Sequence, residues 1–173
     1  MRQRNGGGQE EAVMSSTTTP TDAGSLTSVL QAAAADAQAI AAEAKAWHWT
    51  VAGPTFGQLH ALFDEVADHA RTAVDELSER LVQLGARPPA FPGEWLRLAR
   101  VDVPAETGER TAIEMLEHLY DSLRTATEAL AADLRGAQEG GDPASVDVLV
   151  QWLRAAENDR WMVAATLRGT GPA

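Results

Sequence analysis

The sequence contains no cysteine among its 173 residues. This absence excludes disulfide bonds, a thiolate nucleophile and any metal site built on cysteine sulfur. Histidine is also scarce, with 4 residues in the whole chain. Any bound metal must therefore be held by histidine, aspartate and glutamate side chains, a nitrogen and oxygen donor set.

Long apolar runs are missing as well. No stretch of about 18 or more apolar residues occurs, so the sequence predicts no membrane-spanning helix and no membrane partner. Residues 1–24 lack the apolar core of a signal peptide. With 45% hydrophobic residues, the chain is long enough to bury one core without covalent support. We therefore expect a single-domain cytoplasmic protein.

Positive charge is in short supply. The chain has 14 basic and 25 acidic residues, a net charge of -11, and its average field repels polyanions. Residues 1–24 are rich in Gly, Ser, Thr and Pro, which predicts a disordered tail, and residues 169–173 form a short uncharged one. Neither tail is a basic arm, so no DNA-binding residue is assigned. DNA is expected to be at most a weak partner, held by many weak patches of an assembly.

Four segments show helical periodicity. Apolar side chains recur at spacings of three and four over residues 26–51, 59–84, 113–134 and 148–167. Gly and Pro separate the segments, and the connection over residues 85–108 contains one short apolar piece, EWLRLARV. No segment alternates as a strand would. The pattern predicts an all-α fold over residues 25–168, a ferritin-like four-helix bundle with a short helix in the long connection between helices 2 and 3.

The second predicted helix carries its polar side chains on one face. At about 100° per residue, Asp64, Asp75 and Glu79 lie within roughly 100° of His60. His60 and Asp64 are about 6 Å apart along the axis, whereas Asp64 and Asp75 are about 16 Å apart. His48, at the end of the preceding antiparallel helix, should lie beside His60. No single metal ion can reach both groups on one helix.

Two incomplete groups would be completed together by a second copy of the chain. If that copy packs across a two-fold axis, the group of His48, His60 and Asp64 meets the partner's copies of Asp75 and Glu79, and two equivalent sites form. Two imidazoles and up to three carboxylates suit Fe(II), Mn(II) or Zn(II). Carboxylates stabilise Fe(III), so the predicted chemistry is that of a ferroxidase.

The same residues carry a family resemblance. From Lys45 the chain reads K-x-x-H-W-x-V-x-G-x-x-F-x-x-L-H-x-x-F-D, and from Asp75 it reads D-x-x-x-E-R-x-x-x-L-G. This run resembles the Dps family, the ferritin-like DNA-binding proteins from starved cells. The resemblance extends more loosely over residues 25–168, and it implies that the family's ferroxidase ligands correspond to His48, His60, Asp64, Asp75 and Glu79.

Further expectations rest on the resemblance alone. They are a hollow homo-dodecamer built from two-fold dimers, iron as the bound metal, oxidation of Fe(II) preferentially by hydrogen peroxide, storage of ferric oxide, and protection of DNA from oxidative damage. The resemblance also suggests Trp49 as an electron donor near the site, although packing in a dimer explains it equally well. It places Asp142 and Asp147 near acidic pores through which iron enters, and helix capping is the alternative for both.

Three other functions are alternatives to this one. A ferritin or bacterioferritin should carry a Glu-x-x-His pair on each of two helices, and the sequence has none, because Glu65 to His69 and Glu114 to His118 are spaced by four. A nucleoid-structuring protein would act mainly by coating DNA. A metal-free interaction bundle would leave Asp75 and Glu79 as a solvated face, with Glu79 paired to Arg80 or Lys45. His69 and His118 are interpreted as ordinary surface or supporting residues.

Overall fold

The computed structural model describes residues 20–106, 108–139 and 142–169, with side chains from residue 26 onward except at residue 139. These residues form five helices: α1 (Pro20–Thr50), α2 (Phe56–Gln83), α3 (Pro92–Leu98), α4 (Ala112–Glu139) and α5 (Pro143–Gly169). No strand occurs in the described ranges. The predicted all-α class is therefore confirmed, including the short helix between the second and third long ones.

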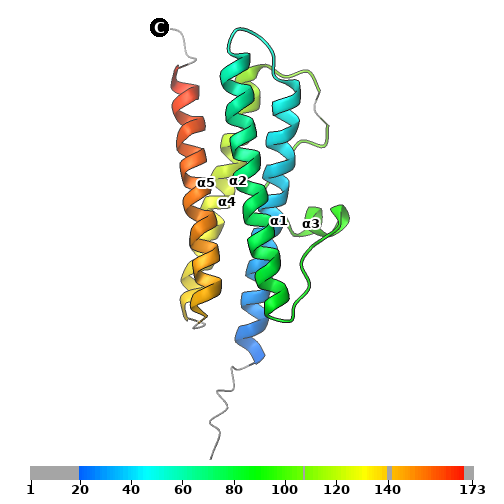
Figure 1. Cartoon of the computed structure of the whole chain (residues 1–173), viewed down its shortest axis with the longest axis vertical. Helices are drawn as coiled ribbons and strands as arrows, with labels where there is room; N and C mark the ends of the chain where they lie inside the picture. The colour runs from blue at the N-terminus through cyan, green and yellow to red at the C-terminus, as the bar shows by residue number, and fades with distance from the viewer. Residues whose placement is uncertain (1–19, 107, 140–141, 170–173) are drawn as a thin grey trace, which may run out of the picture.

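The four long helices lie side by side and α3 lies outside them (Figure 1). α1 and α2 form one antiparallel hairpin and α4 and α5 form the other, while the connection between the hairpins runs the length of the bundle beside α1. The chain thus makes one long crossover, the ferritin-like arrangement. Because this crossover runs the length of the bundle, the α1–α2 turn and the start of α4 lie at the same end of the bundle.

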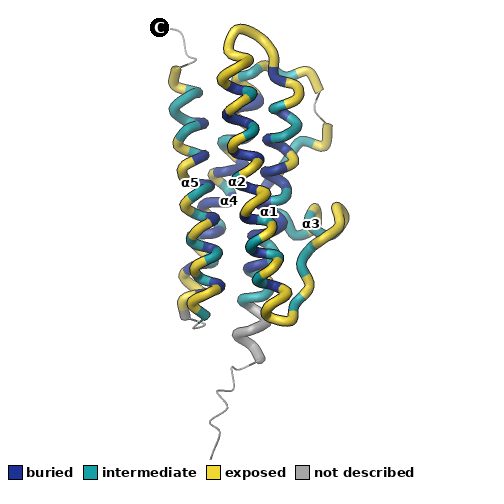
Figure 2. The backbone as a smooth tube through the Cα atoms, in the orientation of Figure 1, coloured by how far each residue is buried: buried dark blue, intermediate teal, exposed yellow. Residues whose placement is uncertain are grey.

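The core forms where the apolar stripes of the long helices meet (Figure 2). The buried positions of α2 recur at the predicted spacing: Leu59, Phe63, Val66, Ala70, Ala73, Leu77 and Leu81. Two predicted stripe residues are exposed instead, Leu84 by 39% and Ile113 by 44%. Leu84 lies just beyond the end of α2 and Ile113 in the first turn of α4, where no neighbouring helix covers them.

An ionic network fixes the crossover to the bundle. The Arg100 guanidinium contacts the Asp36 carboxylate of α1 at 2.7 Å and the Asp133 carboxylate of α4 at 2.6 Å. The backbone N–H of Arg100 also donates to Asp36 Oδ1 at 2.6 Å. Burial raises the pKa of Asp36 even with the guanidinium beside it. One residue of the connection therefore ties two helices of different hairpins together.

Two features concern the start of the chain and the surface. α1 begins at Pro20, five residues before the predicted boundary at 25, and proline is favoured in the first turn of a helix because its missing N–H needs no partner there. The rest of the predicted tail, residues 1–19, lies outside the described residues, as does most of the short tail at 169–173. No helix in the described ranges is long and apolar enough to span a membrane.

Candidate metal centre

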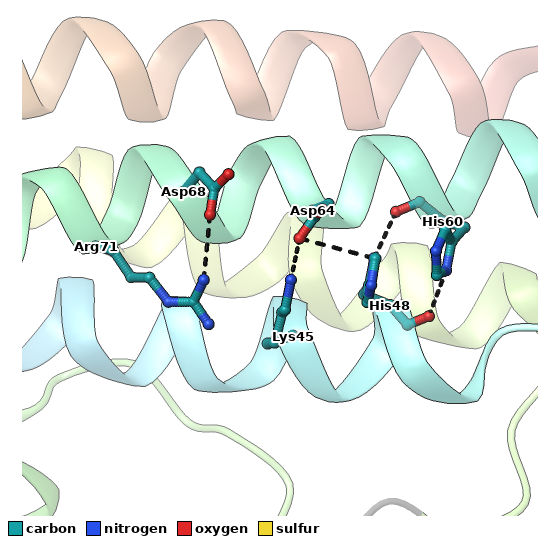
Figure 3. A network of polar contacts seen from close by, with 6 residues as sticks. All are labelled: Lys45, His48, His60, Asp64, Asp68 and Arg71. Atoms are coloured by element: carbon teal, nitrogen blue, oxygen red, sulfur yellow. Dashed lines mark hydrogen bonds and ion pairs between the residues drawn. The ribbon is translucent and has the colours of Figure 1, made fainter.

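His48 and His60 come together because the α1–α2 turn is tight. α1 ends at Thr50, Gly53 adopts a φ of 105°, which favours glycine, and α2 begins two residues after Pro54. His48 therefore lies in the last turn of α1 and His60 in the second turn of α2. Their rings stack with centroids 3.6 Å apart, as Figure 3 shows. The predicted pairing of these two histidines is observed.

The two imidazoles are held by each other's backbone. His48 Nδ1 lies 2.8 Å from the carbonyl oxygen of His60, and His60 Nδ1 lies 2.8 Å from the carbonyl oxygen of His48 (Figure 3). A carbonyl can only accept, so each Nδ1 must carry the hydrogen and donate it. In the neutral imidazole the lone pair is then on Nε2. A metal-binding histidine is commonly prepared in this way, with one nitrogen donating to a fixed acceptor and the other free to bind.

Asp64 lies beside this pair but is held by a lysine. Its Oδ1 is 3.8 Å from His48 Nδ1, and the same oxygen accepts a short hydrogen bond from Lys45 Nζ (Figure 3). That hydrogen bond is the main reason why the pKa of Asp64 lies below its ordinary value. The carboxylate is therefore ionised at neutral pH, and an ammonium group stands next to it.

Asp75 and Glu79 are exposed further along α2, away from the histidines. Glu79 lines a surface hollow of about 350 Å³ together with Ser78, Val82 and Pro88. In the part of the chain that the structure describes, no three His, Asp or Glu side chains lie close enough to hold a metal ion within one subunit. The geometry therefore leaves the predicted ligands in two separate groups on one chain.

The alternative pairing of Glu79 with a cation is wrong for both proposed partners. Arg80 donates to the Asp142 carboxylate at 3.0 and 2.7 Å, and Lys45 is bound to Asp64. Arg80 of α2 is held by Asp142 before the start of α5, and Lys45 of α1 is held by Asp64 of α2. Glu79 therefore pairs with neither Arg80 nor Lys45.

Large apolar side chains are exposed near both groups. Trp49 follows His48 and is 71% exposed, and Phe56, whose ring centroid is 4.9 Å from that of His60, is 46% exposed. Val82, beside Glu79, is 61% exposed. Single exposed apolar residues are common, but these flank the candidate ligands on the α1–α2 hairpin. They are suited to contact with another protein surface.

Asp142 has a structural role at the start of α5. Its carboxylate accepts hydrogen bonds from Arg80, from Ser145 Oγ at 2.7 Å and from the Ser145 backbone N–H at 3.4 Å. Burial raises its pKa, but these donors outweigh burial and the net pKa is lowered. Asp147 is exposed and accepts a hydrogen bond from Gln151 at 2.8 Å. The capping alternative thus fits Asp142, and a pore role for the two residues stays a prediction.

Three buried acids were not singled out from the sequence. They are Asp36, described above, Glu43 and Asp159, all less than 5% exposed. Glu43 accepts hydrogen bonds from Trp47 Nε1 at 3.1 Å and from Ser122 Oγ at 2.6 Å, and burial raises its pKa to about 7. Each of these acids falls on an otherwise apolar helical stripe, and this position is the feature of the sequence that could have identified it as buried.

Comparisons with known proteins agree with the fold. The family model described as a ferritin-like domain matches residues 9–170. The chain is 35% identical over 121 residues to general stress protein 20U of Bacillus subtilis, a match that covers 70% of this chain and 82% of that protein. It is 32% identical to DNA protection during starvation protein 1 of Deinococcus radiodurans, covering 71% of this chain and 59% of that protein.

A solved structure is also similar over nearly the whole chain. The Dps protein of Vibrio cholerae O1, described as a member of a broad superfamily of ferritin-like diiron-carboxylate proteins, superposes with a TM-score of 0.79 at 25% identity, covering 94% of this chain and 99% of that one. Fold and comparisons together define a ferritin-like protein. Within that class, the chain belongs to the Dps family.

Proposed function

We propose that this chain is a ferroxidase and iron-storage protein. It oxidises Fe(II), preferably with hydrogen peroxide, at sites shared between two subunits, and stores the ferric product inside a hollow homo-oligomer, a dodecamer. Removing peroxide together with Fe(II) protects DNA, as the name of the Deinococcus radiodurans relative suggests for that protein. The observation that carries the proposal is the reciprocally anchored pair His48 and His60, whose Nε2 atoms take no part in the anchoring hydrogen bonds, with the ionised Asp64 3.8 Å from His48 Nδ1.

The residues fit Fe(II) as a substrate. Imidazole and carboxylate groups together suit a first-row divalent ion, and additional carboxylates favour the trivalent product. Two Fe(II) ions give up one electron each, and hydrogen peroxide takes up both electrons and two protons to become two molecules of water. The protein's part is to orient its ligands: the Nδ1 hydrogen bonds fix the two imidazole rings and leave Nε2 for the ion, and the lowered pKa of Asp64 keeps that carboxylate ionised.

A site shared between subunits accounts for the separation of the ligands. The histidine half, defined as His48, His60 and Asp64, needs more carboxylates than its own chain brings near it. The acidic half, defined as Asp75 and Glu79, has carboxylates and no histidine. An antiparallel two-fold dimer would pair each histidine half with the partner's acidic half. The exposed side chain of Trp49 would then be covered by the partner, where it either packs or donates an electron.

The remaining parts of the proposal concern assembly and location. Asp142 and Asp147 are proposed to lie near the pores through which iron enters, although the hydrogen bonds of Asp142 to Arg80 make Asp147 the freer of the two to attract a cation. A cytoplasmic location is proposed from the sequence.

One experiment tests activity and assembly together. Protein kept anaerobic is loaded with Fe(II) and titrated with hydrogen peroxide while Fe(III) is followed by absorbance and the mass in solution by light scattering. We expect oxidation of about two Fe(II) per peroxide, from the electron balance, on a particle with the mass of a dodecamer. A well-ordered monomer, or oxidation no faster than in buffer, would contradict the proposal.

Lys45 should weaken metal binding at the histidine half. Its ammonium group occupies Asp64 Oδ1, so an incoming cation must displace it and is also repelled by it. We expect Lys45→Met to bind Zn(II), a redox-inert probe, roughly tenfold more tightly, since removing an opposing charge at this range is worth about one decade. Isothermal titration calorimetry measures the change.

The matched control is Arg71→Met. Arg71 pairs with Asp68 at 3.1 Å on the same helix, in a similar surface ion pair that touches neither half of the site (Figure 3). This variant should bind Zn(II) like the parent. Equal affinities for the Lys45 variant and the parent would mean that the ammonium does not compete with the metal.

A further inference from the structure

His69 and Asp159 form a pair outside the proposed ferroxidase site. His69 of α2 lies with its Nδ1 2.9 Å from Asp159 Oδ1 of α5. The Asp159 side chain is 1% exposed, whereas the imidazole is 38% exposed. His69 is nine residues from His60, so at about 100° per residue it projects from the opposite side of α2. The two histidine positions are therefore separate on the protein.

The carboxylate fixes how the imidazole is presented. With Nδ1 donating to the buried Asp159, the lone pair of the neutral imidazole is on Nε2, on the side of the ring away from that carboxylate, and the side chain as a whole is 38% exposed. Histidines that bind metals commonly donate their other N–H to a carboxylate in this way, which sets the tautomer and the ring orientation. Glu65 lies one helical turn before His69 on α2 and is exposed. Burial is the main reason why the pKa of Asp159 is raised, and the negative charge of Glu65 raises it further.

The charge around this pair is unbalanced. Three other carboxylates that contact a neighbouring segment, Asp36, Asp64 and Asp142, each contact an arginine or a lysine. Asp159 instead contacts an imidazole, and its buried Oδ2 has no hydrogen-bond partner among the described residues. One acidic group, Asp159, thus contacts the imidazole, and a second, Glu65, lies one helical turn away on α2. A divalent cation on the exposed side of His69 would supply the missing positive charge.

We propose that His69 and Glu65 form a second, weaker binding site for a divalent transition metal such as Zn(II) or Fe(II). His69 Nε2 and the Glu65 carboxylate are the protein ligands, and water completes the coordination. Asp159 is a positioning residue, because it touches the imidazole and not the metal. The site does not depend on the dimer or on the oxidation of iron, so it can hold even if the proposed function is wrong.

Crystals of the full chain soaked in zinc chloride test the location directly. Anomalous scattering at the zinc edge should show a peak about 2.1 Å from His69 Nε2. This measurement uses the unaltered protein, so it does not depend on whether a variant folds. If zinc binds at the histidine half and not at His69, the inference is wrong and the proposed function stands. If zinc binds at His69 and not at the histidine half, the inference stands and the proposed function is not supported.

Variants test the roles of the individual residues. Titration calorimetry with Zn(II) should show one site fewer per chain in His69→Gln, whose amide can still donate to Asp159. Asp159→Asn should keep the site but weaken it by about 10- to 100-fold, the usual effect of losing a carboxylate partner behind a ligating histidine. The control is His118→Gln, an exposed histidine on α4, which should bind like the parent. Unchanged binding in His69→Gln would overturn the proposal.

Discussion

Fe(II) oxidation is expected to fall at least about 100-fold when His48 is replaced by alanine, and equally when Asp75 is replaced. Loss of a residue that only supports a metal ligand already lowers metal affinity or activity by about 10- to 100-fold, so loss of a ligand itself should lower activity at least as much. The two residues lie on different helices and do not meet within one chain, so equal losses imply one shared site. The rate of Fe(III) formation after mixing with peroxide measures the effect.

Co-expression of the two inactive chains provides the sharper test. In a dimer of one His48→Ala chain and one Asp75→Ala chain, one of the two sites contains both substitutions and the other contains neither. With random pairing, half of the dimers are mixed, so about a quarter of all sites should be intact. The mixed oligomer should therefore regain about a quarter of the parent's rate.

The control combines two substitutions within the same half. A mixture of His48→Ala and His60→Ala chains has a damaged histidine half in every site, whichever chains pair, so no activity should return. Recovery in both mixtures, or in neither, would show that the ligands are not divided between subunits as proposed.

Stability is expected to become less dependent on pH when Glu43 is replaced by glutamine. Burial raises the pKa of Glu43 to about 7, from an ordinary value of 4.5. Between these values the native chain binds a proton that the unfolded chain has released, so the stabilisation is fully present below pH 4.5 and is lost as the pH rises to about 7. The loss amounts to about 3 kcal/mol at roughly 1.4 kcal/mol per pKa unit.

Glutamine reproduces the protonated carboxyl without titrating. Its oxygen can accept from Trp47 Nε1 and its amide can donate to Ser122 Oγ, the two groups that Glu43 contacts. Relative to the parent, Glu43→Gln should therefore gain about 3 kcal/mol between pH 4.5 and 7 in urea unfolding. Glu117→Gln, at an exposed position of α4, should show no such gain. A constant difference at all pH values would mean that Glu43 does not change its protonation state in this range.

Much of the fold could be predicted from local spacing. The stripe of α2 is buried as its periodicity indicates, and the Gly53-Pro54 turn brings the two histidines together as expected. Both features depend on residues that are close in the sequence. Whether the acidic half joins the histidine half was also inferred from spacing, and it stays a prediction because it concerns two chains.

What spacing could not provide are contacts between distant residues. Asp36 meets Arg100 64 residues away, Glu43 meets Ser122 79 residues away, and His69 meets Asp159 90 residues away. The periodicity of apolar residues does not identify an acidic residue that lies among them on a buried stripe. Such an acid needs a partner from another helix, and only the packing of the helices decides which one. The interpretation of His69 as an ordinary surface or supporting residue did not identify its partner for this reason.

The reciprocal hydrogen bonds of His48 and His60 also bear on the thermodynamics of metal binding. Each ring is already confined to one rotamer by the other helix's backbone, so little side-chain entropy remains to be lost when a metal binds. Binding to such a preorganised pair loses less affinity to the ordering of its ligands. Substitutions that loosen the turn between α1 and α2 should therefore weaken binding through entropy, even when both imidazoles are retained.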